Sequence, residues 1–144
     1  MNYRLAQLTD IPAFVAIEQA QPRCAQWALA GWKTELAEKS AYVCCAEEEG
    51  RVVGFLALRM AAGVAEILNV GVNPLYLRRG LGQTLLERSI MWLRTQKCEQ
   101  LTLEVGARNL AAIGLYQKVG FTRIGVRKNF YRDGEDAWIM EFVL

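Results

Sequence analysis

The chain has 144 residues, of which 53% are hydrophobic, and a formal net charge of +2. This length fits a single domain, residues 1–144, with a sizeable core, and so small a net charge gives no reason to expect a nucleic-acid partner. The sequence contains no histidine, which excludes Ser-His-Asp and Cys-His centres and every metal site with histidine ligands. Acid–base chemistry must therefore come from Glu, Asp, Tyr, Cys or Lys side chains.

The cysteines predict neither a metal site nor a disulfide framework. They are scattered along the chain without a CxxC pair, and Cys44 and Cys45 lie in an apolar run, where we interpret them as core thiols. No apolar run approaches the ~20 residues of a membrane span, and Met1–Leu5 lacks the apolar region of a secretion signal. We therefore expect a cytoplasmic protein that uses no metal and does not associate with a membrane.

The first half of the chain predicts two helices followed by an antiparallel meander. After a short strand at residues 3–8, Thr9 or Asp10 can cap a first helix. Turn signals at residues 47–50 and 61–63 then separate three runs of strand-forming residues. The expected elements are helices over 11–19 and 26–38, and strands over 41–46, 51–58 and 66–72.

The second half predicts a parallel crossover and a final hairpin. From Gly80 to about Lys97, apolar residues recur at helical spacing: Leu81, Leu85, Leu86, Ile90 and Leu93. A helix between two strands favours a right-handed parallel crossover. The remaining expected elements are a strand over 101–105, a helix capped by Asn109 and ended by Gly120, and strands over 121–128 and 137–143. The predicted fold class is α/β (α+β), with a mixed, mostly antiparallel sheet and helices on both faces.

A glycine-containing loop precedes the helix that begins near Gly80. Its residues are Arg78, Arg79, Gly80, Leu81, Gly82 and Gln83. Glycine lets backbone approach a phosphate closely, and the free N–H groups at a helix start attract an anion. The loop lacks the Gly-Lys-Ser/Thr of a P-loop, and its distance from the preceding strand does not fit a dinucleotide fingerprint. It predicts a diphosphate site of another kind, although such a glycine pair is often only a turn.

Gly71 lies inside the strand Val70-Gly71-Val72. A glycine in mid-strand often marks a bulge, which would leave backbone N–H groups available to a ligand carbonyl. The alternative is a small residue beneath a helix, and the sequence favours neither.

Two further side chains are candidates for catalysis. Leu101, Leu103 and Val105 share one face of their strand, so Glu104 points to the other. A carboxylate in an interior strand either has a function or lies on a half-exposed face. Tyr116 lies on the following helix, where a tyrosine is more often a core residue than a catalytic one.

Together these segments resemble the GCN5-related N-acetyltransferase superfamily and, within it, the bacterial ribosomal-protein-alanine N-acetyltransferases. The resemblance is specific from about Ala65 to the C-terminus and loose over residues 1–60. The segments that carry it are 66–74, 78–82, 103–105 with 109–113, 115–121, 127–131 and 135–140.

The resemblance implies a seven-stranded sheet with a central splayed parallel strand pair, and acetyl-CoA as co-substrate. It implies that Arg78–Gln83 bind the diphosphate, that Val70, Gly71 and Val72 pair with the pantetheine arm, and that Asn109 contacts the cofactor. It further implies that Glu104 is the base and Tyr116 the acid in direct transfer to an amine. One departure is Leu77, where the family usually has Gln or Arg; Arg78 or Arg79 can compensate.

The expected acceptor is the N-terminal α-amine of a protein, such as a ribosomal protein with N-terminal alanine. Two alternatives stay open. One is an acetyltransferase for a small-molecule amine, which would share the cofactor half and differ in the acceptor groove. The other is a non-catalytic acyl-CoA-binding module. The sequence makes no prediction of the oligomeric state.

Overall fold

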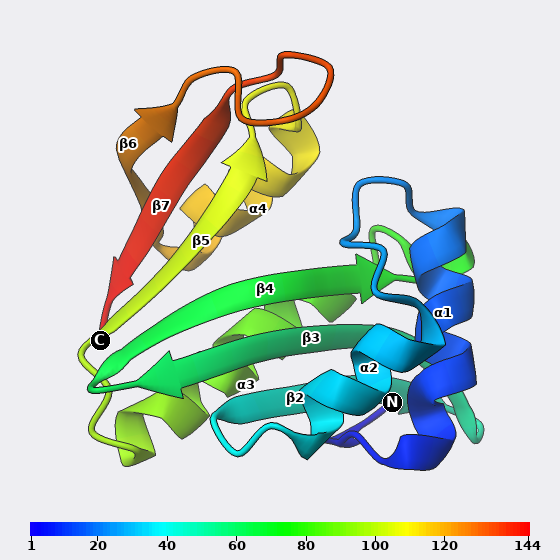
Figure 1. The fold of residues 1–144 in the computed structure, drawn as a ribbon. Helices are drawn as coiled ribbons and strands as arrows, with labels where there is room; N and C mark the ends of the chain where they lie inside the picture. The colour runs from blue at the N-terminus through cyan, green and yellow to red at the C-terminus, as the bar shows by residue number, and fades with distance from the viewer.

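A seven-stranded sheet runs through the computed structural model of residues 1–144, in the order β1-β2-β3-β4-β5-β7-β6 (Figure 1). Every neighbouring pair is antiparallel except β4 and β5. The strands are β1 (Asn2–Leu5), β2 (Ala41–Glu48), β3 (Arg51–Ala61), β4 (Val64–Val72), β5 (Gln100–Gly106), β6 (Thr122–Arg127) and β7 (Ala137–Val143). The helices are α1 (Ile11–Ala20), α2 (Ala28–Ala37), α3 (Leu81–Thr95) and α4 (Leu110–Val119), with 3₁₀ turns η1 (Leu8–Asp10) and η2 (Pro74–Tyr76).

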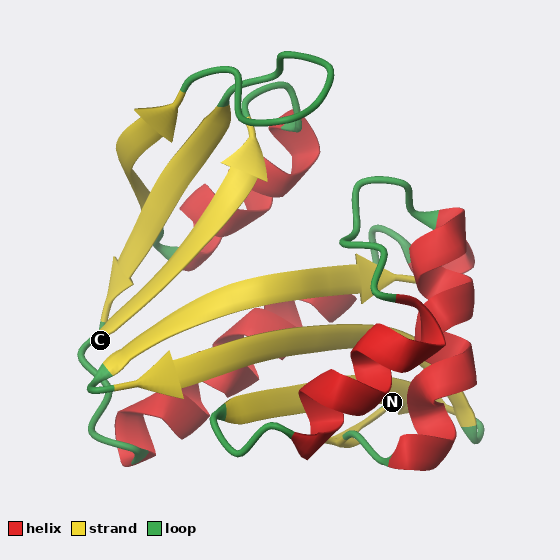
Figure 2. Ribbon diagram, viewed as in Figure 1, coloured by secondary structure: helices red, strands yellow, loops and turns green.

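Helices cover both faces of the sheet, as predicted (Figure 2). Helices α3 and α4 pack on one face, where all five apolar residues of the predicted α3 stripe are buried. On the other face α1 and α2 enclose a second core with three aromatic rings at its centre. In that core the Trp32 ring lies 4.7 Å from that of Phe14 and 5.0 Å from that of Phe55. None of the four helices has the length and apolar character needed to cross a membrane.

The parallel strands β4 and β5 stay together only at their beginnings. Their ladder consists of Val64–Gln100, Ala65–Leu101 and Glu66–Thr102, after which the strands diverge (Figure 1). Strand β5 then remains paired with β7 along its length. The two strands run in the same direction, so the gap between them is widest at their carboxyl ends. The predicted splayed parallel pair is confirmed.

The bulge in β4 is at Leu68 and not at Gly71, so the first of the two explanations left open for this glycine does not hold. Ala57 pairs with Asn69 and Leu58 with Ile67, which leaves Leu68 as the extra residue. Gly71 pairs regularly with Phe55. A Cβ at Gly71 would lie 2.7 Å from Phe55 Cζ and 3.0 Å from Cys24 Sγ. This packing leaves no room for a side chain at position 71. The strand itself is regular there.

Several element boundaries differ from the predicted ones for local reasons. Helix α2 begins at Ala28, two residues later than expected, because the N–H groups of Trp27 and Ala28 donate to the Glu18 carboxylate. Strand β2 continues to Glu48, because the turn after it needs only Glu49 and Gly50, with φ of 50° and 75°. Two residues with positive φ match the twist of a tight hairpin.

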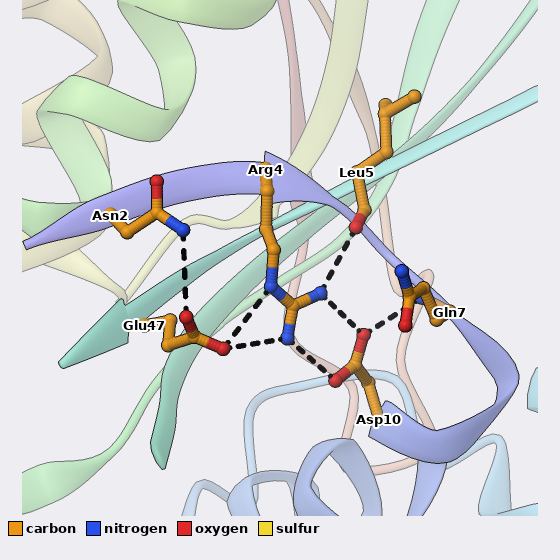
Figure 3. Close-up of polar contacts among 6 residues, drawn as sticks. All are labelled: Asn2, Arg4, Leu5, Gln7, Asp10 and Glu47. Atoms are coloured by element: carbon orange, nitrogen blue, oxygen red, sulfur yellow. Dashed lines mark hydrogen bonds and ion pairs between the residues drawn. The ribbon is translucent and has the colours of Figure 1, made fainter. Parts of the chain in front are cut away.

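Arg4 fastens the edge strand β1 to its neighbours (Figure 3). Its guanidinium donates to both carboxylate oxygens of Asp10, at 2.8 and 2.9 Å, and to Glu47 Oε2 at 2.9 Å. Asp10 Oδ2 also accepts from the Gln7 N–H at 2.7 Å. The hydrogen bonds from Arg4 lower the pKa of Asp10. This network joins β1, β2 and the start of α1, so it fixes the helix layer against the sheet.

Candidate active site

The gap between β4 and β5 exposes one edge of β4. The Asn73 N–H donates to Val53 O at 2.8 Å, and Gly71 lies opposite Phe55, so these odd-numbered residues bond toward β3. In an antiparallel ladder the intervening residues, Val70 and Val72, then direct their N–H and C=O groups toward the gap. An extended ligand with amide groups can pair with this edge as a further strand would.

The segment 21–27, which joins α1 and α2, lies against this edge. Cys24 Sγ donates to Val70 O at 3.2 Å, and Gln21 Nε2 donates to Val72 O at 2.9 Å. Burial, with a smaller effect of Glu18, raises the pKa of Cys24 to about 11, so the thiol keeps its proton at neutral pH. Both bonds come from side chains and can be exchanged for those of a ligand.

Two buried side chains hold the segment 21–27 in place. Glu18 accepts from Trp32 Nε1 at 2.7 Å, from the Trp27 N–H at 3.1 Å and from Asn69 Nδ2 at 3.3 Å. Asn69, beside the β4 bulge, bonds both the N–H and the C=O of Ala25. Sequence reasoning missed this arrangement, because a single Glu in an amphipathic helix gives no signal of burial.

The glycine loop ends in an uncapped helix N-terminus. Arg78 and Gly80 both have positive φ, 64° and 77°, and no side chain caps α3 at Gly80. The first turn of a helix leaves its N–H groups without intrahelical partners, and here they belong to Leu81, Gly82 and Gln83. A Cβ at Gly80 would meet no atom within 4 Å, so a ligand has open access to this backbone. The loop therefore fits a diphosphate group.

Gly82 has a packing role in addition to its place in the loop. A Cβ there would lie 3.2 Å from Leu115 Cδ2 of α4, so this glycine permits the close approach of α3 and α4. Earlier in the loop, the guanidinium of Arg79 lies 4.8 Å from the centre of the Tyr76 ring. Its Nη1 is 3.9 Å from Glu48 Oε2. Leu77 is half exposed and offers no polar group.

Glu104 and Tyr116 reach the same region from different elements. Glu104 lies on the open face of β5 with 29% of its side chain exposed, and Arg127 Nε is 2.9 Å from its Oε1. Tyr116 lies on α4, and burial raises its pKa to about 12, with smaller effects from Cys24 and Tyr131. Tyr131 in turn has a raised pKa because of burial and the nearby carboxylate of Glu104. Tyr131 therefore interacts electrostatically with both residues that the sequence singled out.

Asn109 caps α4, as predicted. Its side-chain oxygen accepts from the Ala112 N–H at 3.3 Å, and Gly120 ends the helix with φ of 124°. Asn109 thus lies in the short connection from Gly106, at the carboxyl end of β5, to α4.

An ion pair crosses the open end of the gap. Arg23 Nη1, in the segment 21–27, lies 3.5 Å from Glu135 Oε2 in the loop between β6 and β7. Glu135 is buried, and the same oxygen accepts from the Arg108 N–H at 2.8 Å. A Cβ at Gly106 would lie 2.6 Å from this oxygen, so the approach depends on glycine. The gap is thus bounded by the β4–β5 ladder at one end and by this pair at the other.

The sequence matches the Acetyltransferase (GNAT) family over residues 5–121. The chain belongs to this family. The match covers most of the first 60 residues as well, where the motifs alone gave only a loose resemblance. No group of three or more His, Cys, Asp or Glu side chains is placed to hold a metal ion.

Individual relatives agree in activity and in structure. The [ribosomal protein bS18]-alanine N-acetyltransferase of Escherichia coli K12 is 35% identical, over 93% of this chain and 91% of its own length. An N-alpha-acetyltransferase of Sulfurisphaera tokodaii is 31% identical, over 96% of this chain and 92% of its own. The crystal structure of the E. coli ribosomal-protein-S18-alanine N-acetyltransferase superposes with a TM-score of 0.89 at 33% identity, covering 99% of this chain and 92% of that one. The protein is accordingly an acetyl-CoA-dependent N-acetyltransferase, and not a mere binding module.

We expect Gly80→Ala to weaken acetyl-CoA binding by about tenfold or more, equivalent to ~1.4 kcal/mol. The new methyl group would strain a left-handed residue and disturb the N–H groups that start α3. Gly50→Ala is a matched control, because Gly50 has φ of 75° and no atom within 4 Å of a Cβ, but lies in the β2–β3 turn.

Both variants should lose about 1 kcal/mol of stability from the left-handed strain, measured by urea unfolding. Only Gly80→Ala should lose affinity in calorimetric titration with acetyl-CoA. Equal affinities for the two variants would show that the diphosphate binds elsewhere.

Proposed function

We propose that the acceptor is the N-terminal α-amine of a protein, and specifically of a ribosomal protein that begins with alanine. Two relatives that match over nine-tenths of this chain support the proposal, since one is named for bS18 alanine and the other for α-amines. This substrate would place the activity in the cytoplasm.

The gap supports a two-sided arrangement of the substrates. The N–H groups of Arg78–Gln83 would hold the diphosphate of acetyl-CoA, with Asn109 beside it. The open edge at Val70 and Val72 would pair with the pantetheine arm, and Gly71, which bonds toward β3, would contribute only its small size. When bound, acetyl-CoA supplies an acetyl group already activated as a thioester. The acceptor would enter between the segment 21–27 and the β6–β7 loop.

In the proposed mechanism the protein moves two protons and stabilises one charge. A protein α-amine has a pKa near ~8, so a large fraction is protonated at neutral pH and cannot attack. Glu104 would take this proton, directly or through a water. An N–H group of Val70 or Val72 would stabilise the negative charge on the carbonyl oxygen. As the C–S bond breaks, Tyr116 would donate its proton to the departing sulfur, and the proton that the attacking nitrogen then loses would restore the tyrosine hydroxyl. The raised pKa of Tyr116 keeps its proton in place over the neutral range.

The acceptor class is tested with a panel of amines and acetyl-CoA. We expect acetylation of a peptide with a free N-terminal alanine, on the α-amine, as located by mass spectrometry. The same peptide with a blocked N-terminus is the control and should stay unmodified even where it contains lysine. Modification only of lysine side chains, or only of a small polyamine, would contradict the proposal that the acceptor is a protein α-amine.

We expect Glu104→Gln to lower kcat at neutral pH by about 10²–10⁴-fold, the usual contribution of a general base. Part of this loss should return at higher pH, where the amine is already neutral. Glu141→Gln is the control. Glu141 pairs with Thr102, so it lies on the same face of the sheet as Glu104. This variant removes a carboxylate that lies away from the gap. A folded Glu104→Gln enzyme with full activity across the pH range would remove Glu104 from the mechanism.

Tyr116→Phe should keep the packing of the ring and remove only the proton donor. Turnover should fall while the melting temperature barely changes. Tyr42→Phe is the matched control, because Tyr42 also has a pKa raised by burial but stacks on Trp92 at 4.0 Å, in the core beneath α3. If Tyr116→Phe instead lowers the melting temperature and leaves turnover intact, Tyr116 is a packing residue.

A further inference from the structure

A bulge in the edge strand β6 decides which face its basic residues occupy. Arg123 pairs with Met140 and Gly125 with Ile139, so Ile124 is an extra residue in the ladder. Without it, residues 123, 125 and 127 would share one face of the sheet. With it, Arg123 lies on one face and Arg127 on the other.

The pairing of β7 with β5 identifies these faces. Met140 pairs with Leu103, and both are buried beneath α3 and α4, so Arg123 belongs to that covered face. Its guanidinium accordingly lies 4.8 Å from the Trp138 ring. Ile139 pairs with Glu104, so Gly125 and Arg127 belong to the face that carries Glu104. Bulges commonly re-aim a side chain next to an active site.

Arg127 is the cation that contacts Glu104. Its Nε lies 2.9 Å from Glu104 Oε1, and Glu104 makes no other ion pair. The Nε–Oε1 distance is the shortest between the two groups, and no other basic side chain lies within 4 Å of the carboxylate. On its other side the guanidinium lies 5.9 Å from the Phe130 ring, which is in edge contact with Tyr131. Arg127 therefore lies between the Phe130 ring and the carboxylate of Glu104.

We propose that Arg127 is a positioning residue for Glu104. Its guanidinium holds the carboxylate of Glu104 in the orientation in which it takes the proton of the acceptor amine. The inference rests on the proposed role of Glu104 as base. The arrangement is a specific one, because a one-residue register shift in β6 would carry Arg127 to the covered face, out of reach of Glu104.

The other charged and titratable groups near the pair are Tyr131, Glu135 and Arg23, from the two segments that face the gap. Arg23 is paired with Glu135, so it does not compete for Glu104. An exposed ion pair alone contributes little to stability. Loss of Arg127 should therefore appear in the rate and not in the folding free energy.

A double-mutant cycle between Arg127 and Glu104 tests the inference. The readout is kcat at saturating acetyl-CoA, with any amine that the wild-type enzyme acetylates, so that the result does not depend on the acceptor class. Arg127→Gln should lower kcat by roughly 10-fold, because a base out of alignment transfers a proton poorly. In the Glu104→Gln background the same substitution should change kcat by less than about twofold, since contacting residues are not additive.

Two further variants separate positioning from structure and from charge. Arg127→Lys should recover most of the rate, because it restores a cation that can reach Oε1. Arg123→Gln removes the same charge from the same strand on the opposite face, and should leave kcat within about twofold of wild type. Melting temperature and acetyl-CoA affinity, measured for every variant, should not change.

Equal losses from Arg127→Gln in both backgrounds would overturn the inference, and so would a loss of the same size in Arg123→Gln. If Glu104→Gln lowers kcat and Arg127→Gln does not, the inference fails and the base assignment survives. If Glu104→Gln leaves kcat unchanged, both fail together.

Discussion

The parting of β4 from β5 after three residue pairs is the constraint on which the rest of the molecule depends. It leaves one edge of β4 without a neighbouring strand in the middle of a sheet, where backbone N–H and C=O groups need partners. In this protein the two carbonyl groups of that edge are bonded by Cys24 and Gln21. An edge that is satisfied by two exchangeable side chains can remain stable and still accept an extended ligand.

The two halves of the sheet, β1 to β4 and β5 to β7, are stabilised separately. Strands β1 to β4 are joined in an antiparallel ladder that is covered by α1 and α2, and the β4 bulge places Asn69 where it can hold the segment 21–27. Strand β5 keeps its full ladder with β7, which also pairs with β6. Neither half needs the other along the gap, so the opening persists without strain. Arg23 and Glu135 then connect the halves at the open end by one ion pair, of which Arg23 is exposed and Glu135 is buried.

The sequence predicted those features that local patterns determine. The apolar stripe of α3, the cap at Asn109 and the stop at Gly120 all depend on residues close in the chain, and each was found where expected. The order of helices and strands likewise led to the parallel crossover, while the splaying of the two strands was expected only from the family resemblance.

The features that the sequence left open depend on distant residues. Gly71 is small because of the Phe55 ring and Cys24, and neither is near it in the chain, so the glycine alone could not decide between a bulge and a packing role. Similarly, nothing in the residues of β6 shows that Ile124 is extra, because the register is set by β7. For this reason Arg127 could be assigned to no face before the strands were paired. The burial of Glu18 has the same origin, since its partners come from β4 and α2.

In a chain without histidine, other side chains supply the titratable groups around the gap. Burial raises the pKa of Tyr116 to about 12 and that of Cys24 to about 11. In both cases the folded pKa lies above the unfolded one, so these groups favour the folded state below pH ~9 and lose that effect as pH rises through the raised values. The same shifts keep both groups protonated at neutral pH, where Cys24 can donate to Val70 O and does not compete with the amine as a nucleophile. Glu104 and Tyr116 both come from the β5 side of the gap, where Arg127 lies beside Glu104, whereas Cys24 bonds the β4 side. In the proposed mechanism the proton donor Tyr116 and the proton acceptor Glu104 would thus act from one side of the gap, while the protonated Cys24 thiol holds the edge of β4 on the other.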